Sequence, residues 1–209
     1  SHVIVPKVFI SAVSSDLRAA RKVVNEALTQ IGCLPVEESI LGTEYGEIRT
    51  MIERRMADCH AVIHLVGRDY GGEPDQATLP EGQPRRSWTQ REYDFAIEHD
   101  MNLYVIVCGD NYPYIETLTD ESEEKQALQA AHRQHVLTEK HLYHEVADED
   151  ALRQRIEQLR EPAEAWRAEI EREQAKRRRL LYGVQRVTSR DSATEFVFGA
   201  SRHYAYAFH

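Results

Sequence analysis

Cysteine is scarce in this sequence, which has three among 209 residues, and no two of them form a Cys-x-x-Cys pair. Cys33, Cys59 and Cys108 lie in apolar segments and are odd in number. This pattern argues against a disulfide framework and against a cysteine zinc site, and it favours reduced thiols in a protein core. We therefore expect a cytoplasmic protein.

Long apolar runs and an excess of positive charge are also missing. Apolar runs such as residues 103–108 fall far short of the roughly 18 residues of a membrane span. The formal net charge is -9, so no general basic surface is available for nucleic acid or for an anionic membrane. We expect neither a membrane nor a nucleic acid as a partner.

The glycine motifs of nucleotide-binding proteins are absent too. The sequence has neither Gly-x-x-x-x-Gly-Lys-Ser/Thr nor Gly-x-Gly-x-x-Gly, which argues against ATPase activity and against conventional dinucleotide binding. It also lacks Gly-x-Ser-x-Gly, the nucleophile motif of α/β-hydrolases. Hydrophobic residues make up 42% and charged residues 29%, a composition typical of a folded domain.

What the sequence does contain is a regular alternation of apolar and amphipathic segments. Strands are predicted at residues 8–10, 34–36, 61–66, 103–108 and 142–146, with amphipathic helices between them. This alternation predicts an α/β fold, most simply a flavodoxin-like five-stranded parallel sheet of order 2-1-3-4-5 with helices on both faces. The carboxyl ends of the strands should form the functional edge.

The segment before the fourth strand contains a long loop and a well-marked helix. Residues 71–86 are polar and numerous enough for a functional loop or lid. Ser87 then begins a Ser-x-x-Gln capping box, with Tyr93, Ala96 and Ile97 as the expected core face of the helix.

A different pattern begins near residue 150. Apolar residues at helical spacing form a stripe: Leu152, Ile156, Leu159, Ala163, Trp166 and Ile170. Two interpretations are open, a terminal helix that packs on the sheet and a surface for self-association. We expect Pro162 to start a second helix, and the alternation at residues 194–198 suggests a strand or hairpin. The predicted organisation is a domain at 1–148 and a helical extension and tail at 149–209.

Two histidine pairs have a spacing that could suggest a metal site. They are His132-x-x-His135 and His141-x-x-His144, and neither is completed to a ligand set. We expect no metal and interpret these histidines as solvated or capping residues.

Trp88 and Glu92 stand one helical turn apart at the start of the helix that follows the third strand. This spacing puts an indole and a carboxylate on one face, which we expect to lie opposite the core face and toward the strand ends. Ligands of such sheets bind in that crevice. The alternative is that Trp88 packs under the preceding loop and Glu92 is solvated.

Several segments carry a family resemblance. They read VFIS at 8–11, DL at 16–17, GCLPVE at 32–37, ADCHAVI at 57–63, VGRDYG at 66–71 and SWTQREY at 87–93. In this order they resemble the N-terminal TIR-like domain of bacterial STAND-type NTPases and related defence proteins, over roughly residues 7–147. Two departures are Thr89, where the family usually has Cys, and the loop 71–86, which is longer than in eukaryotic adaptors.

The resemblance implies an NAD+ glycohydrolase in which Glu92 is the catalytic carboxylate, NAD+ is the substrate, and no cofactor is required. It also implies a homo-oligomer that acts as an effector of bacterial immunity or cell death. The chemistry is reasonable, because nicotinamide is a cationic leaving group and its departure gives an oxocarbenium-like state that one carboxylate can stabilise.

Further substrate-binding candidates follow from position at the strand ends. Ser11 and Ser14 flank the first turn, where they either meet a pyrophosphate or cap the helix. Tyr70 and Trp88 either stack on nicotinamide or adenine or pack in the core. Tyr45 closes the site, mediates assembly or is an exposed loop aromatic. Asp16 is interpreted as a helix N-terminal charge rather than as a catalytic acid.

Two other functions remain open. One is a non-catalytic TIR-like scaffold that signals by homotypic assembly, and the other is an enzyme similar to nucleoside 2-deoxyribosyltransferases. The presence of both Trp88 and Glu92 favours an enzyme, because a scaffold has no need for that pair.

Overall fold

The computed structural model describes residues 4–38, 44–116, 120–139 and 142–194, with side chains described as far as residue 183. The chain divides into two compact units. One is Val5–Ala163, and the other contains the part of the last helix that begins at Glu164. The first unit holds the whole sheet and extends beyond the predicted boundary at 148.

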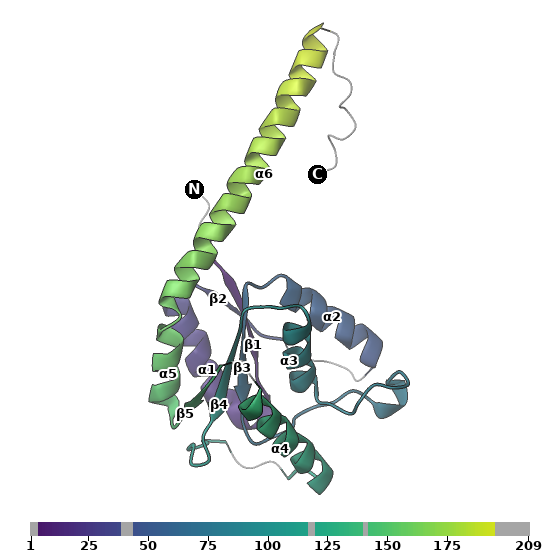
Figure 1. Ribbon diagram of the computed structural model, residues 1–209, viewed down its shortest axis with the longest axis vertical. Coiled ribbons are helices and arrows are strands. Elements are labelled where there is room, and N and C mark those ends of the chain that lie inside the picture. The colour runs from purple at the N-terminus through teal and green to yellow at the C-terminus, as the bar shows by residue number, and fades with distance from the viewer. Residues whose placement is uncertain (1–3, 39–43, 117–119, 140–141, 195–209) are drawn as a thin grey trace. The chain divides into compact units, whose positions relative to one another are not determined.

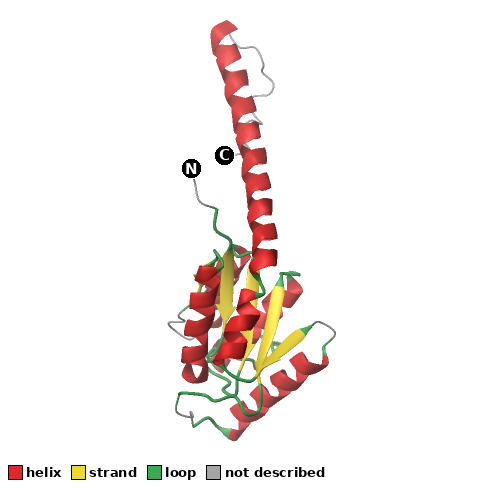
Figure 2. Ribbon diagram, turned by 90° about the vertical axis from the view of Figure 1, so that its left-hand side faces the viewer, coloured by secondary structure: helices red, strands yellow, loops and turns green. Residues whose placement is uncertain are grey.

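Five strands form a single parallel sheet in the order β2-β1-β3-β4-β5. They are β1 (Lys7–Ser11), β2 (Leu34–Val36), β3 (Ala61–Val66), β4 (Leu103–Cys108) and β5 (Tyr143–Val146). Figure 2 shows these strands side by side in one layer. The α/β fold and strand order predicted from the alternation are confirmed.

The register of the central strands brings two polar residues together. All six residues of β3 are buried, as expected for a strand covered on both faces. Ser11, the last residue of β1, is paired with His64 of β3. A serine and a histidine therefore lie side by side between β1 and β3, where the order of the strands along the chain reverses.

Helices cover both faces of the sheet (Figure 1). They are α1 (Ser14–Gln30), α2 (Tyr45–Ala57), α3 (Trp88–Glu98), α4 (Glu123–Thr138) and α5 (Glu149–Glu157), and a 3-10 turn η1 lies at Gln76–Thr78. The last helix is α6 (Arg160–Thr194). α1 contacts α5 on one face, and α2 contacts α3 on the other. The capping box at Ser87 is present in full, because its hydroxyl accepts from the Gln90 amide and the Gln90 side chain accepts from the Ser87 amide.

α3 buries a broader face than its sequence suggested. Tyr93 and Ala96 are buried as expected, but Ile97 is 48% exposed and Phe95 takes its place against α2 and β1. Trp88 and Glu92, only 4% and 6% exposed, are buried as well. The predicted division of this helix into a core face and an open ligand face is therefore wrong, because α2, α4 and the sheet all pack against it.

α5 shows how the apolar stripe after residue 150 begins. The Asp148 carboxylate accepts from the Ala151 amide at 2.8 Å and caps the helix. Leu152 and Ile156 are fully buried and α5 contacts α1, so this part of the stripe is a terminal helix packed on the domain.

The last helix, α6, begins two residues before Pro162, so this proline is its third residue and not its first. A proline is tolerated there because first-turn amides have no helical acceptor. Thr194 ends α6, and the rest of the predicted strand, 195–198, lies outside the described residues. Among the helices described, none is both long and apolar enough to cross a membrane.

Candidate functional site

Glu92 lies beside the carboxyl end of β1. The Ser11 side chain is fully buried there, and as a hydrogen-bond donor it lowers the pKa of the Glu92 carboxyl. The Ser11 hydroxyl also lies 3.5 Å from the Thr89 carbonyl oxygen, one turn earlier in α3. A carboxylate from α3 and a hydroxyl from β1 thus meet at the switch point between β1 and β3.

The surroundings of Glu92 change its acidity. Burial raises the pKa of this carboxyl to about 7, although the hydrogen bond from Ser11 and the charge of Arg21 act in the opposite direction, and the charge of Glu38 raises it further. A carboxyl group with a pKa near neutrality is typical of catalytic sites, because it gains or loses a proton under working conditions.

Behind Ser11, a row of polar side chains continues into α4. His64 Nδ1 lies 2.9 Å from Ser11 Oγ, and His64 Nε2 lies 2.9 Å from His132 Nε2. Arg86 Nη2 lies 3.3 Å from His132 Nδ1, and the Arg86 guanidinium also binds both carboxylate oxygens of Asp94. We call Arg86, His132, His64 and Ser11 the polar chain.

The polar chain corrects the interpretation of His132 as a solvated or capping residue. His132 is buried, and burial lowers its pKa to about 3, so it is neutral at physiological pH. The sequence carried one signal for this cluster, since His64 is the single polar residue of a continuous apolar strand. A buried imidazole requires a hydrogen-bonding partner.

A basic hollow lies along the exposed side of α1. This cavity of about 370 Å³ is lined by Ser14, Arg18, Arg21 and Lys22, together with Asn25 and Glu37. Arg21 donates to Glu37 at 3.0 Å and its charge also acts on Glu92. The N-cap of α1 is Val13, so Ser14 is not the capping residue. Three cationic side chains around a hydroxyl can hold an anion.

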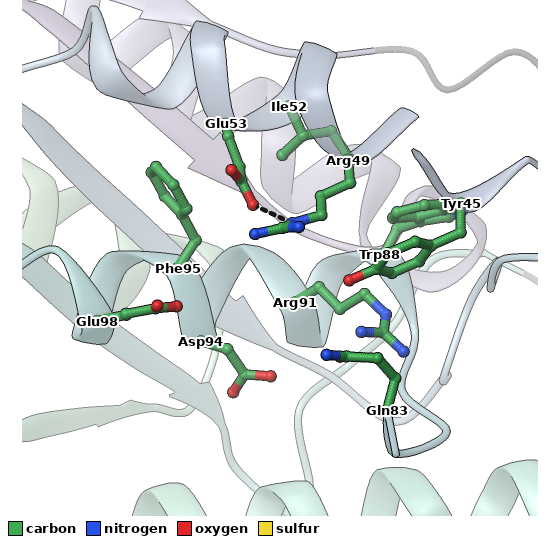
Figure 3. A pocket seen from close by; sticks show the side chains of 10 residues that line it. All are labelled: Tyr45, Arg49, Ile52, Glu53, Gln83, Trp88, Arg91, Asp94, Phe95 and Glu98. Atoms are coloured by element: carbon green, nitrogen blue, oxygen red, sulfur yellow. Dashed lines mark hydrogen bonds and ion pairs between the residues drawn. The ribbon is translucent and has the colours of Figure 1, made fainter. Parts of the chain in front are cut away.

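A second cavity, of about 200 Å³, lies between α2 and α3 (Figure 3). Its lining is of mixed charge: Arg49 donates to Glu53 at 2.5 Å on the α2 side, and Arg91 and Asp94 come from α3. Glu92 is not among the residues that line it.

Tyr45 and Trp88 form one wall of this second cavity. Their rings stack with centroids 6.2 Å apart, and the Arg91 guanidinium lies 5.0 Å from the Tyr45 ring. Tyr45 is the first residue of α2 and is buried, so it is not an exposed loop aromatic. Trp88 belongs to the core cluster and presents only part of its indole to the cavity.

One family is similar to the chain over most of this structure. The family model described as "Domain of unknown function (DUF4062)" matches residues 7–161. The chain belongs to the DUF4062 family. No curated protein matches it. The range of the DUF4062 domain nearly coincides with the compact unit Val5–Ala163 and includes the sheet, Glu92 and both cavities.

Tyr70 helps to hold the loops of the DUF4062 domain in place through hydrogen bonds. It is fully buried, its hydroxyl donates to Glu73 at 2.9 Å, and burial raises its pKa. Arg85 also donates to Glu73, at 2.8 Å, so Glu73 joins Tyr70 and Arg85 at the two ends of the loop 71–86. The Tyr70 and Gly71 amides donate to the Glu121 carboxylate. Tyr70 lines neither of the two cavities described above.

Asp16 also holds a loop. Its buried carboxylate accepts from the amides of Arg68 and Asp69 at 2.8 and 3.0 Å, directly after β3. Burial raises the pKa of Asp16 to about 6. A side chain at Gly67 would place its Cβ 2.5 Å from Asp16 Oδ2, so glycine is required there. This position makes Asp16 an anchor for the turn after β3.

The three cysteines and the acidic and histidine side chains are the groups that metal or redox chemistry would use. Cys33, Cys59 and Cys108 form no disulfide, and burial raises the pKa of Cys59 to about 11 and that of Cys108 to about 12. Across the part of the DUF4062 chain that the structure describes, no three His, Cys, Asp or Glu side chains are arranged to hold a metal ion.

Proposed function

We propose that this DUF4062 domain is a TIR-like NAD+ glycohydrolase in which Glu92 is the catalytic carboxylate. The observation that carries the proposal is the position of Glu92: a buried carboxylate beside Ser11 at the carboxyl end of β1, with Arg21 of the basic hollow close enough to act on its charge. Open parallel sheets bind ligands at this switch point.

The charges of the site are complementary to those of the substrate. NAD+ carries an anionic pyrophosphate and a cationic nicotinamide ribosyl group. The basic hollow offers Arg18, Arg21 and Lys22 to the pyrophosphate, and Glu92 offers its carboxylate to the ribosyl cation. A cation bound beside Glu92 favours the ionised carboxyl group, so binding itself would bring Glu92 to its active form.

The reaction needs little acid assistance. The bond between C1′ of the ribose and the nicotinamide nitrogen breaks, and its electron pair leaves with neutral nicotinamide. The ribosyl cation is stabilised by the Glu92 carboxylate, water adds to C1′, and the proton lost from that water passes to Glu92 or to solvent. A desolvated carboxylate is more effective in this role than a solvated one, because the local dielectric constant is low.

The physiological role and the assembly rest on the TIR-like resemblance. By that resemblance the protein is an effector of bacterial immunity or cell death and acts as a homo-oligomer in the cytoplasm. Trp88, which packs against Tyr45, then lines the neighbouring cavity between α2 and α3 rather than serving as a free stacking platform.

A non-catalytic scaffold is the second candidate. It is favoured by the enclosure of Glu92, which is only 6% exposed and lines neither of the two cavities. In that case Glu92 is a structural acceptor for Ser11.

A measurement of nicotinamide release from NAD+ by concentrated protein distinguishes the glycohydrolase from the non-catalytic scaffold. We expect turnover by the wild type and a loss of about 10²-fold or more in Glu92→Gln, because the main charge stabiliser is removed. Glu98→Gln is the matched control, since Glu98 is an exposed carboxylate of the same helix. Equal turnover by wild type and a folded Glu92→Gln protein contradicts the assignment, and an inactive wild type supports the scaffold.

A further inference from the structure

We propose that the polar chain is directional: Arg86 and His132 fix the tautomer of His64, and His64 in turn holds the Ser11 proton on the side of Glu92. His132 and His64 are then positioning residues for Glu92. The catalytic meaning of this inference rests on the proposed function, but the direction of the chain does not.

The direction follows from the one group in the chain that can only donate. A guanidinium has no acceptor, so at the 3.3 Å contact Arg86 donates to His132 Nδ1, which must be unprotonated. Asp94 holds Arg86 in this position from the other side. A neutral His132 therefore carries its proton on Nε2.

The next two contacts are determined by the first. His132 Nε2 donates to His64 Nε2 across 2.9 Å, so His64 Nε2 is an acceptor. The proton of His64 is then on Nδ1, which donates to Ser11 Oγ across 2.9 Å. The hydroxyl proton of Ser11 cannot point back toward His64, so it points toward α3, where the Thr89 carbonyl accepts from it at 3.5 Å and where its influence as a donor lowers the pKa of Glu92.

Other charged and titratable groups lie around the polar chain. Glu92 is acted on by Arg21 of α1 and by Glu38, which follows β2. His132 faces Tyr93 of α3, with ring centroids 5.1 Å apart, and is influenced by His135 of its own helix.

The polar chain therefore connects the loop 71–86 with Glu92 through hydrogen bonds and side-chain contacts. Arg86 is the last residue of the loop 71–86, and Glu92 lies at the opposite end of the polar chain. A donor held on the Glu92 side stabilises its carboxylate form, whereas a Ser11 proton turned toward His64 would leave Glu92 with one hydrogen bond fewer.

The direction is tested by ¹⁵N NMR of the histidine side chains in the full chain at neutral pH, with signals assigned by comparison with His132→Gln and His64→Gln. We expect the proton on Nδ1 of His64 and on Nε2 of His132. A proton on Nε2 of His64 overturns the proposal, whatever the enzymatic activity of the protein.

The effect on Glu92 is tested by titrating its ¹³C-labelled carboxyl group, assigned with Glu92→Gln. His132→Phe removes the donor to His64, and we expect the pKa of Glu92 to rise by roughly one unit. His132→Gln keeps an N–H donor and should restore most of the wild-type value. His135→Gln, one turn along α4, is the control and should leave it unchanged.

The same variants separate this proposal from the proposed function. If the wild type hydrolyses NAD+, the pH profile of kcat should shift upward in His132→Phe, with KM little changed, and return in His132→Gln. If the wild type is inactive, the titration alone decides. A Glu92 pKa that is the same in His132→Gln, His132→Phe and wild type overturns the coupling, and should His132→Phe not fold, Arg86→Met takes its place.

Discussion

Glu92 has lost most of its hydration, and this loss couples its ionisation to the stability of the fold. Its pKa is raised from 4.5 to about 7 in the folded state, so between these values the native protein binds a proton more tightly than the unfolded chain. The contribution to stability is fully present below about pH 4.5 and is lost as the pH rises through 7. Carboxylates that form ion pairs show the opposite sign.

Glu92→Gln should therefore gain stability relative to wild type as the pH rises. We expect the difference in free energy of unfolding to change by about 3 kcal/mol in favour of the variant between pH 4.5 and 7.5. Urea titrations at several pH values measure it. Asp16, whose pKa is also raised by burial, is present in both proteins and cancels in the difference. A difference that is constant with pH would show that Glu92 is hydrated in solution.

Substitution of Trp88, which lines the cavity between α2 and α3, tests whether this aromatic residue is chiefly a packing residue. Its indole is 4% exposed and packs with Phe9, Ile52 and Phe95. Trp88→Ala should lower the free energy of unfolding by about 3–5 kcal/mol, whereas Trp88→Phe should lose much less. Chemical denaturation of both variants checks this. A stable Trp88→Ala protein with a strongly raised KM for NAD+ would instead make Trp88 a binding platform.

At the scale of the elements, the sequence predicted the strands and their order well. β1, β3 and β4 are buried on both faces, so their apolar runs are continuous and easily recognised. The capping box at Ser87 was equally clear, because it is a contact between residues three apart. Local interactions of this kind are encoded in a short stretch of chain.

The candidate site was less predictable because its contacts are not local. Ser11, His64 and His132 are far apart in the sequence, and only the parallel register and the packing of α4 bring them together. For a related reason, Ile97 was expected to be buried but is exposed, and Glu92 was expected on an open face but is buried. Helical periodicity gives the direction of a side chain but not which neighbouring element covers it.

α5 offers a test of where the folded domain ends. Leu152 is fully buried in the helix that packs on α1, so Leu152→Ala should cost about 2–5 kcal/mol of stability. Leu142→Ala is the matched control, because Leu142 is 83% exposed and should change stability by about 0.5 kcal/mol or less. Equal urea midpoints for the two variants would place α5 outside the cooperative unit and favour a domain that ends at 148.

At the scale of the whole molecule, the chain has two compact units with different surfaces. The first contains the DUF4062 domain with its enclosed core. In the second, α6 carries the basic run 176–179 followed by the exposed apolar residues Leu180 and Leu181, at 55% and 38% exposure. Apolar residues exposed in a group on a helix are typical of contacts with other molecules.

The proposed assembly therefore has a testable surface. If α6 mediates it, NAD+ turnover per molecule and the sedimentation coefficient of the full chain should both rise over a hundredfold range of concentration.

The double variant Leu180→Gln/Leu181→Gln should remain a monomer with the wild-type urea midpoint, because neither residue is buried. Ile115→Gln, at an apolar site of the domain that is even more exposed, is the control and should behave as wild type. Association that persists in the double variant would move the interface to another surface. A wild type that stays monomeric with constant specific activity would show that each DUF4062 domain builds its site alone, and the link between loop 71–86 and Glu92 would then operate within one chain.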